Sequence, residues 1–145
     1  MSETIKFRCK LSTTNPDAKL GLKIQLDSAT QFETDHVTGV TDCAFEIPDT
    51  ETSHEIVITM SGKTHDHTKI DADGNIVSDA LLEISDIEID EIAVSKLLFD
   101  QAKYSHDFNG TGAPGVHKFF GSMGCNGSVS VTFTTPFYLW LLENM

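Results

Sequence analysis

Basic residues are scarce in this chain. Lysine and arginine together number 10, against 22 aspartate and glutamate residues, so the formal net charge is -12 at pH 7. A field of this sign repels phosphate backbones and anionic lipid headgroups. We therefore expect neither nucleic acid nor a membrane among the partners.

Long apolar runs are also missing. No window approaches the roughly 20 apolar residues that a membrane-spanning helix needs. The first residues, MSETIKFRCKL, show no basic region followed by an apolar stretch, which is the pattern of a secretory signal. We expect a protein that is made in a cytoplasm without a signal peptide.

Cysteine is rare and irregularly spaced. The chain has three cysteines, Cys9, Cys43 and Cys125, an odd number with wide separations. This excludes a disulfide framework and a CxxC metal site. Because free cysteine is among the most buried residue types, we expect three buried thiols.

Short runs of alternating apolar and polar residues are abundant, and turn clusters separate them. Ile5, Phe7, Cys9 and Leu11 alternate with basic residues, and the same spacing of two recurs along the chain. The predicted strands cover residues 5–11, 22–26, 31–34, 43–47, 54–60, 81–89, 104–108, 116–120 and 129–133. Turns at intervals near 8–12 residues are typical of sandwiches, so the sequence predicts an all-β, single antiparallel β-sandwich domain over residues 1–145.

Two segments fit this pattern less well. Residues 91–104 fit either an extended segment or a short helix, and an extended chain or one helical turn is favoured. Residues 137–142, FYLWLL, are apolar on both faces. We expect a strand that is buried on both sides, and an oligomer contact is the alternative.

The polar connection between residues 60 and 81 holds the candidate chemistry. His65 and His67 lie two residues apart, a spacing at which two imidazoles can share a zinc ion with a third ligand. No third ligand is evident from the sequence. A polar loop that happens to contain two histidines is the favoured interpretation, because a zinc site needs three or four ligands.

Residues 71–75, DADGN, resemble the start of a calcium loop, because closely spaced carboxylates precede a glycine. The EF-hand spacing fails: with Gly74 as the sixth residue, the first would be Lys69 and the twelfth Ala80. Aspartate and glycine also suit a tight turn. Both interpretations stay open, and the turn is favoured.

Catalytic signatures are not found. Cys125 lies between glycine and asparagine, and Ser105 precedes His106, but neither pair sits in a nucleophile motif. No glycine-rich segment opens a helix as a phosphate-binding loop does. We expect a protein that is not an enzyme.

Three segments, at residues 20–27 (LGLKIQLD), 54–60 (HEIVITM) and 79–90, resemble calcium-dependent xylan-binding carbohydrate-binding modules. These modules are β-sandwiches of the jelly-roll kind that bind sugar hydroxyls through a calcium ion. The resemblance covers about half of the chain. It implies the fold and, more remotely, sugar binding.

The family pattern has an Asn-Asp pair after the strand at 54–60, and later an Asp-x-x-Leu-x-Val-Asp run. Asp79 matches the first aspartate of that run. Ser61 and Gly62 stand where the pair would be, and Ser85 stands where the last aspartate would be. The scaffold matches the family, whereas the metal ligands do not.

The whole chain also resembles small uncharacterised proteins of tailed phages that infect marine bacteria, above all at residues 13–18, 69–80, 106–112 and 118–145. This resemblance implies a virion accessory or structural protein, located in the virion, that contacts other virion proteins or further copies of itself. We expect a docking surface at the 105–128 loops or in a set formed by His65, His67, Phe137, Tyr138 and Trp140.

Two other functions remain open. The alternative to the virion role is a lectin-like module for a host-surface glycan, assisted by calcium at Asp71, Asp73 and Asp79. A metal-dependent enzyme that uses His65 and His67 is the third hypothesis. Calcium is the one cofactor that the sequence suggests.

Overall fold

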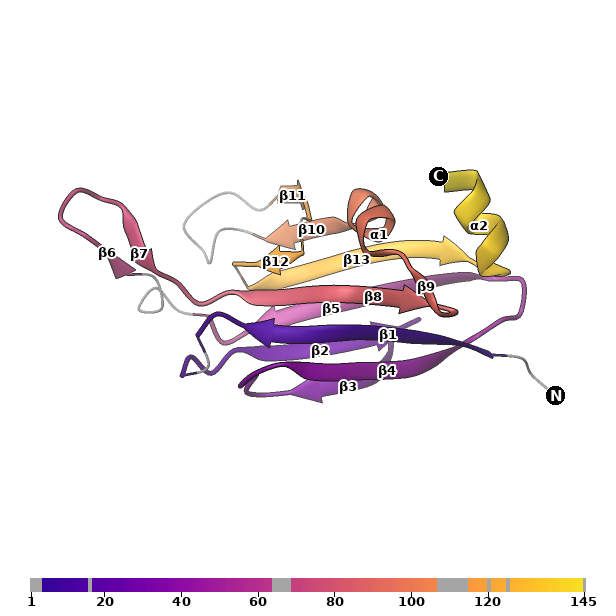
Figure 1. The fold of residues 1–145 in the computed structure, drawn as a ribbon, viewed down its shortest axis with the longest axis horizontal. Helices are drawn as coiled ribbons and strands as arrows, with labels where there is room; N and C mark the ends of the chain where they lie inside the picture. Colours follow the sequence, from indigo (N-terminus) through magenta and orange to yellow (C-terminus); the bar gives the residue numbers. More distant parts are fainter. Residues whose placement is uncertain are drawn as a thin grey trace.

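The computed structural model describes residues 4–15, 17–63, 69–106, 115–119, 121–124 and 126–144. Most of them lie in antiparallel strands that form two facing sheets (Figure 1). This confirms the predicted β-sandwich.

The first sheet has the strand order β12-β8-β1-β4, with β9 paired to β8. The second has the order β11-β10-β13-β5-β2-β3. The strands of the first sheet are β1 (Thr4–Thr13), β4 (Thr41–Pro48), β8 (Leu82–Ile89), β9 (Ile92–Ala93) and β12 (Ser122–Met123). Those of the second are β2 (Gly21–Leu26), β3 (Ala29–Thr34), β5 (Ser53–Ser61), β10 (Lys103–His106), β11 (Gly115–Lys118) and β13 (Gly127–Thr134).

Alternation along each strand fills the space between the sheets. In β1 the side chains of Ile5, Phe7, Cys9 and Leu11 are buried, and the basic residues between them are exposed. Each large apolar side chain buried in this way contributes about 1.5–3 kcal/mol. A shift of one residue would turn the whole apolar set to solvent, so the pattern fixes the register, in which Phe7 lies opposite Phe45.

Cys9 and Cys43 lie opposite each other on β1 and β4, and both are buried free thiols, as predicted. The hydrogen bond between the two thiols, together with burial, raises the pKa of Cys9 far above its usual range. Cys125, the third predicted thiol, lies outside the described residues.

The prediction for residues 137–142 was wrong, because they belong to a helix, α2 (Phe137–Asn144). Phe137 and Trp140, three positions apart, are buried, while Tyr138 and Leu139 are exposed. One-sided burial at this spacing is that of a surface helix. Because residues 137–142 are all apolar, the sequence shows no helical period of 3.6 residues, and the segment was therefore interpreted as a strand.

Residues 91–104 contain more helix than predicted. After the short strand β9, α1 (Ser95–Gln101) runs for seven residues and buries Leu98. The chain then becomes extended again in β10. The favoured prediction of an extended chain or one turn therefore holds only for the flanks of this segment.

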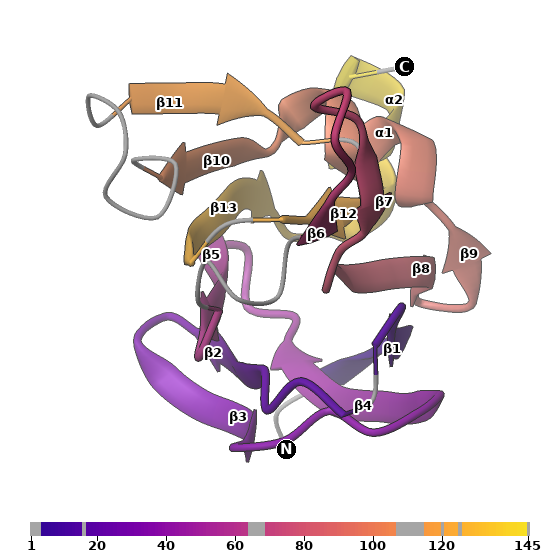
Figure 2. The same ribbon diagram turned by 90° about the vertical axis from the view of Figure 1, so that its left-hand side faces the viewer.

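A small hairpin of β6 (Lys69–Ile70) and β7 (Ile76–Ser78) projects from one end of the sandwich, and α2 lies at the other end (Figure 1). Figure 2 views the molecule from the hairpin end, with the two sheets behind the hairpin.

Candidate functional site

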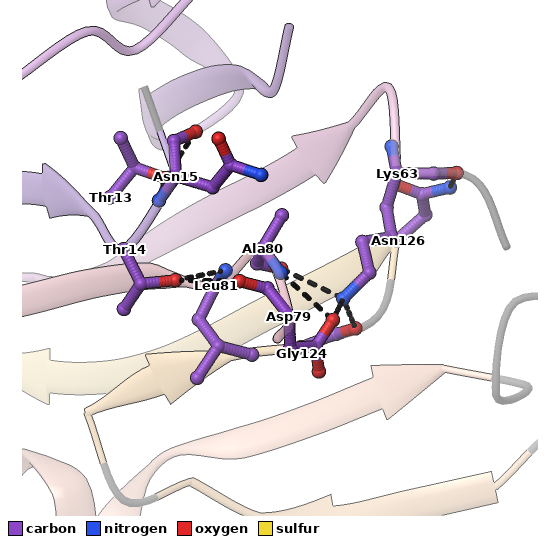
Figure 3. Close-up of polar contacts among 9 residues, drawn as sticks. All are labelled: Thr13, Thr14, Asn15, Lys63, Asp79, Ala80, Leu81, Gly124 and Asn126. Atoms are coloured by element: carbon purple, nitrogen blue, oxygen red, sulfur yellow. Dashed lines mark hydrogen bonds and ion pairs between the residues drawn. The ribbon is translucent and has the colours of Figure 1, made fainter. Parts of the chain in front are cut away.

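Four chain segments meet at the hairpin end of the sandwich. Strands β1 and β5 end there, and β8 and β13 begin there (Figure 1). The connections next to these strand ends are joined by polar contacts (Figure 3). We call the residues of this network the loop-end cluster: Thr13, Thr14, Asn15, Lys63, Asp79, Ala80, Leu81, Gly124 and Asn126.

Lys63 is the centre of the loop-end cluster. Its side chain is 2% exposed, and its Nζ donates hydrogen bonds to Asp79 Oδ1 at 2.6 Å, Ala80 O at 2.7 Å and Gly124 O at 2.9 Å. An ammonium has three N–H donors, and here all three have an acceptor (Figure 3). The carboxylate of Asp79 compensates the buried charge.

The backbone of Lys63 is held as firmly as its side chain. Its N–H donates to Asn126 Oδ1 at 2.9 Å, and Asn126 Nδ2 donates to Lys63 O at 2.9 Å. Gly62 precedes it with φ +85°, and a Cβ at Gly62 would lie 2.3 Å from Lys19 O. Only glycine fits this position. The sequence therefore fixes the path along which Lys63 enters the cluster.

Residues 79–81 are tied to the end of β1 by Thr14. Its hydroxyl donates to Asp79 O at 3.2 Å and accepts from Leu81 N at 3.0 Å. The Thr14 N–H donates to Leu81 O at 3.1 Å. Asp79 Oδ1 also accepts the N–H of Ala80 at 2.8 Å. These contacts join segments that are far apart in sequence.

The predicted calcium ligands Asp71 and Asp73 lie in the turn of the β6–β7 hairpin. Asp71 Oδ1 accepts the N–H groups of Asp73 and Asn75, both at 2.9 Å, and Gly74 has φ +86°. This is a side-chain-stabilised tight turn, the interpretation that the sequence favoured. Both aspartates are exposed.

Asp71, Asp73 and Asp79 are not assembled into one ligand set. Asp79 bonds to Lys63, whereas the other two belong to the hairpin turn. Within the described part of the chain, no three histidine, cysteine, aspartate or glutamate side chains come together in a way that could hold a metal ion. His65 and His67, the predicted zinc pair, lie outside the described residues.

The aromatic part of the predicted docking surface lies away from the loop-end cluster, on α2 (Figure 1). Phe137 and Trp140 are 2% and 6% exposed, and their rings lie 5.7 and 6.3 Å from that of Phe133. Tyr138 is 59% exposed. Of these three residues, Tyr138 alone exposes its side chain to solvent.

A shallow hollow of about 360 Å³ lies on the first sheet, where β1, β4 and β8 run side by side. Charged side chains of both signs line it, and Lys10 lies opposite Asp42 and 3.7 Å from Asp86. This hollow is a second polar surface that a small hydrophilic ligand could contact.

Sequence reasoning did not single out Lys63. Lysine is almost never fully buried unless it is paired, and the residues that pair with Lys63 are distant from it in the sequence. The available signal was indirect: Ser61 and Gly62, just before this lysine, stand where the pattern of the resembled modules has an Asn-Asp pair.

No helix among the described residues is long and apolar enough to cross a membrane. No protein-family model matches the sequence, and no curated protein matches it significantly.

Two solved structures are similar in fold. One is a selenomethionine form of vCBM60, described in connection with two families of calcium-dependent carbohydrate-binding modules that circular permutation links. It has a TM-score of 0.53 and 12% identity, over 88% of this chain and 89% of that chain. The other is vCBM60 in complex with galactobiose, with a TM-score of 0.48 and 16% identity, over 89% of this chain and 97% of that chain. The chain is thus similar to a calcium-dependent carbohydrate-binding module in its β-sandwich fold.

Proposed function

We propose that this protein is a non-catalytic glycan-binding module. The observation that carries the proposal is the likeness of fold to vCBM60 over nearly the full length of both chains. Since one fold can serve several functions, the site itself has to be tested. The likeness favours the glycan-binding alternative over the virion role. Phage origin, virion location and virion partners remain predictions without support from any finding.

The hairpin end is the surface that we assign to glycan contact. Binding residues are often carried by loops that a rigid scaffold positions, and here the loop-end cluster anchors the connections beside the hairpin. Asp73 and Asn75 expose polar groups at the hairpin turn. Carboxylate and amide oxygens accept hydrogen bonds from sugar hydroxyls.

Calcium does not fit the residues of the loop-end cluster. Calcium takes 6–8 oxygen ligands. Here the Asp79 carboxylate and the carbonyls of Ala80 and Gly124 already accept hydrogen bonds from Lys63. The proposed glycan contact therefore relies on protein side chains directly.

A glycan panel tests the proposal. We expect the wild-type protein to bind at least one oligosaccharide class on an immobilised panel, confirmed by calorimetry in solution. Asp73→Ala, which removes the acceptor, should weaken binding, and Asp42→Ala, in the hollow of the first sheet, should leave it unchanged. A loss with Asp42→Ala alone would contradict the hairpin-end assignment, and a chain that binds no member of the panel would contradict the proposed function.

A further inference from the structure

The acceptors around Lys63 form a cradle of the kind that holds a hard cation. One carboxylate oxygen of Asp79, the carbonyl oxygen of the adjacent Ala80 and the carbonyl oxygen of the distant Gly124 converge on one point (Figure 3). Carboxylate and backbone carbonyl oxygens are the ligand types of calcium sites. At that point lies the ammonium nitrogen of Lys63.

The occupant of the cradle is the ammonium group of Lys63. Ala80 O and Gly124 O lie 2.7 and 2.9 Å from Nζ, within the range of charge-assisted N–H···O hydrogen bonds, and Asp79 Oδ1, at 2.6 Å, lies slightly closer. Calcium ligands lie at 2.3–2.6 Å and are more numerous. One ammonium and one carboxylate also balance in charge.

Lys63 cannot leave the cradle at low cost. Its backbone is clamped by Asn126 on both its N–H and its carbonyl, and its side chain is 2% exposed. Before a metal ion could enter, the ammonium would have to give up three hydrogen bonds and move past buried surroundings. The chain's net charge of -12 attracts cations in general. What keeps a metal ion out of the cradle is therefore the arrangement around Lys63 and not the net charge of the protein.

We propose that Lys63 is the resident cation of the loop end: its ammonium does the work that a divalent ion does in a metal-dependent module. It joins the connections after β5, before β8 and before β13, and it orders them without calcium. This inference concerns the architecture of the loop end and holds whether or not a glycan binds there.

The first test uses the wild-type protein. Its thermal unfolding midpoint, Tm, is measured in a chelator, in millimolar CaCl₂ and in the same concentration of MgCl₂. We expect the two metal salts to give the same Tm within about 1 °C, because a ligand stabilises a protein only where it binds the folded state. A rise of several degrees that calcium gives and magnesium does not would overturn the proposal.

The second test removes the ammonium. Lys63→Ala should lower Tm by about 10 °C, because the Asp79 carboxylate loses its buried partner. Ethylammonium, which carries three N–H donors, should restore part of the loss, whereas tetramethylammonium, which has the same charge and no N–H donor, should not. Lys23→Met, at an exposed lysine 3.8 Å from Glu33, should change Tm little and should not respond to either ion. An unchanged Tm in Lys63→Ala, or equal rescue by both ions, would overturn the proposal; if Lys63→Ala does not fold, the wild-type test still decides.

Discussion

Lys63 Nζ lies 2.6 Å from Asp79 Oδ1, although the two residues are 16 positions apart. Lys63 follows β5, a strand of the second sheet, and Asp79 precedes β8, a strand of the first. The lysine side chain is 2% exposed and the aspartate side chain 25%. The ion pair thus joins the connection after β5 to the connection before β8.

Removal of both partners of the Lys63–Asp79 ion pair should cost less than the two single removals added together. We expect Lys63→Met and Asp79→Leu each to lower the free energy of unfolding by about 3 kcal/mol, because each leaves a charge without its partner. The double variant should lose clearly less than the sum, since two apolar side chains leave no charge buried. Urea unfolding of the four proteins measures this coupling. The exposed pair Lys23 and Glu33 is the matched control, and its coupling free energy should be below about 1 kcal/mol. If the losses at Lys63 and Asp79 simply add, the two side chains do not stabilise each other as described.

Gly62 is expected to tolerate no side chain. Gly62→Ala should destabilise the protein by about 2 kcal/mol or more, because φ is +85° and the new Cβ would lie 2.3 Å from Lys19 O. Gly39→Ala, where a Cβ would meet nothing within 4 Å, should change stability by less than about 0.5 kcal/mol. Chemical denaturation compares the two variants, and equal effects would show that the backbone at Gly62 is not restricted as described.

Helix α2 is expected to contribute to the core through one face. Trp140→Ala should cost about 3–5 kcal/mol, because the indole is 6% exposed and packs against Phe133 and Phe137. Tyr138→Ala, on the same helix but 59% exposed, should cost less than about 0.5 kcal/mol. The test is the unfolding free energy of both variants. A larger loss for Tyr138→Ala would mean that the two faces of the helix are reversed.

Asp27 should make stability depend on pH in acid. Burial tends to raise the pKa of Asp27, but hydrogen bonds from the His54 ring and from the Glu55 N–H outweigh it, so the pKa is lowered from 3.8. A carboxyl whose pKa is lowered by folding stabilises the protein above its unfolded pKa, and this contribution disappears as the pH falls through the lowered folded value.

The Asp27→Asn variant checks this pH dependence. Because the Asp27 side chain is 46% exposed, we expect a loss of only about 1 kcal/mol at neutral pH and a flatter decline of stability below about pH 4. Denaturant unfolding between pH 6 and pH 2 gives both quantities. The same acid slope in the variant and the wild-type protein would rule out Asp27 as the source.

Local patterns explain which features were predictable from the sequence. The alternation in β1, β5 and β13 and the turn at Asp71 depend on neighbouring residues, so they were read correctly. The helical form of residues 137–142 was missed, because their apolar side chains point in all directions and hide the period.

The candidate site was less accessible from sequence than the fold. Asp79 was singled out as a calcium ligand, but its actual partner, Lys63, and the carbonyl of Gly124 come from distant segments. Backbone carbonyls leave no trace in the residue type, and a lysine that will be buried looks like any surface lysine. Only the three-dimensional arrangement shows that a side chain fills the cradle.

Calorimetric titration of the wild-type protein with the best glycan from the panel, first in chelator and then in calcium, tests the account most directly. We predict binding in chelator, with a dissociation constant that calcium leaves unchanged within about twofold, an effect below about 0.5 kcal/mol. Binding that appears only with calcium would contradict direct contact between the glycan and protein side chains, and would leave glycan binding itself intact. No heat in either buffer would contradict the proposed function itself.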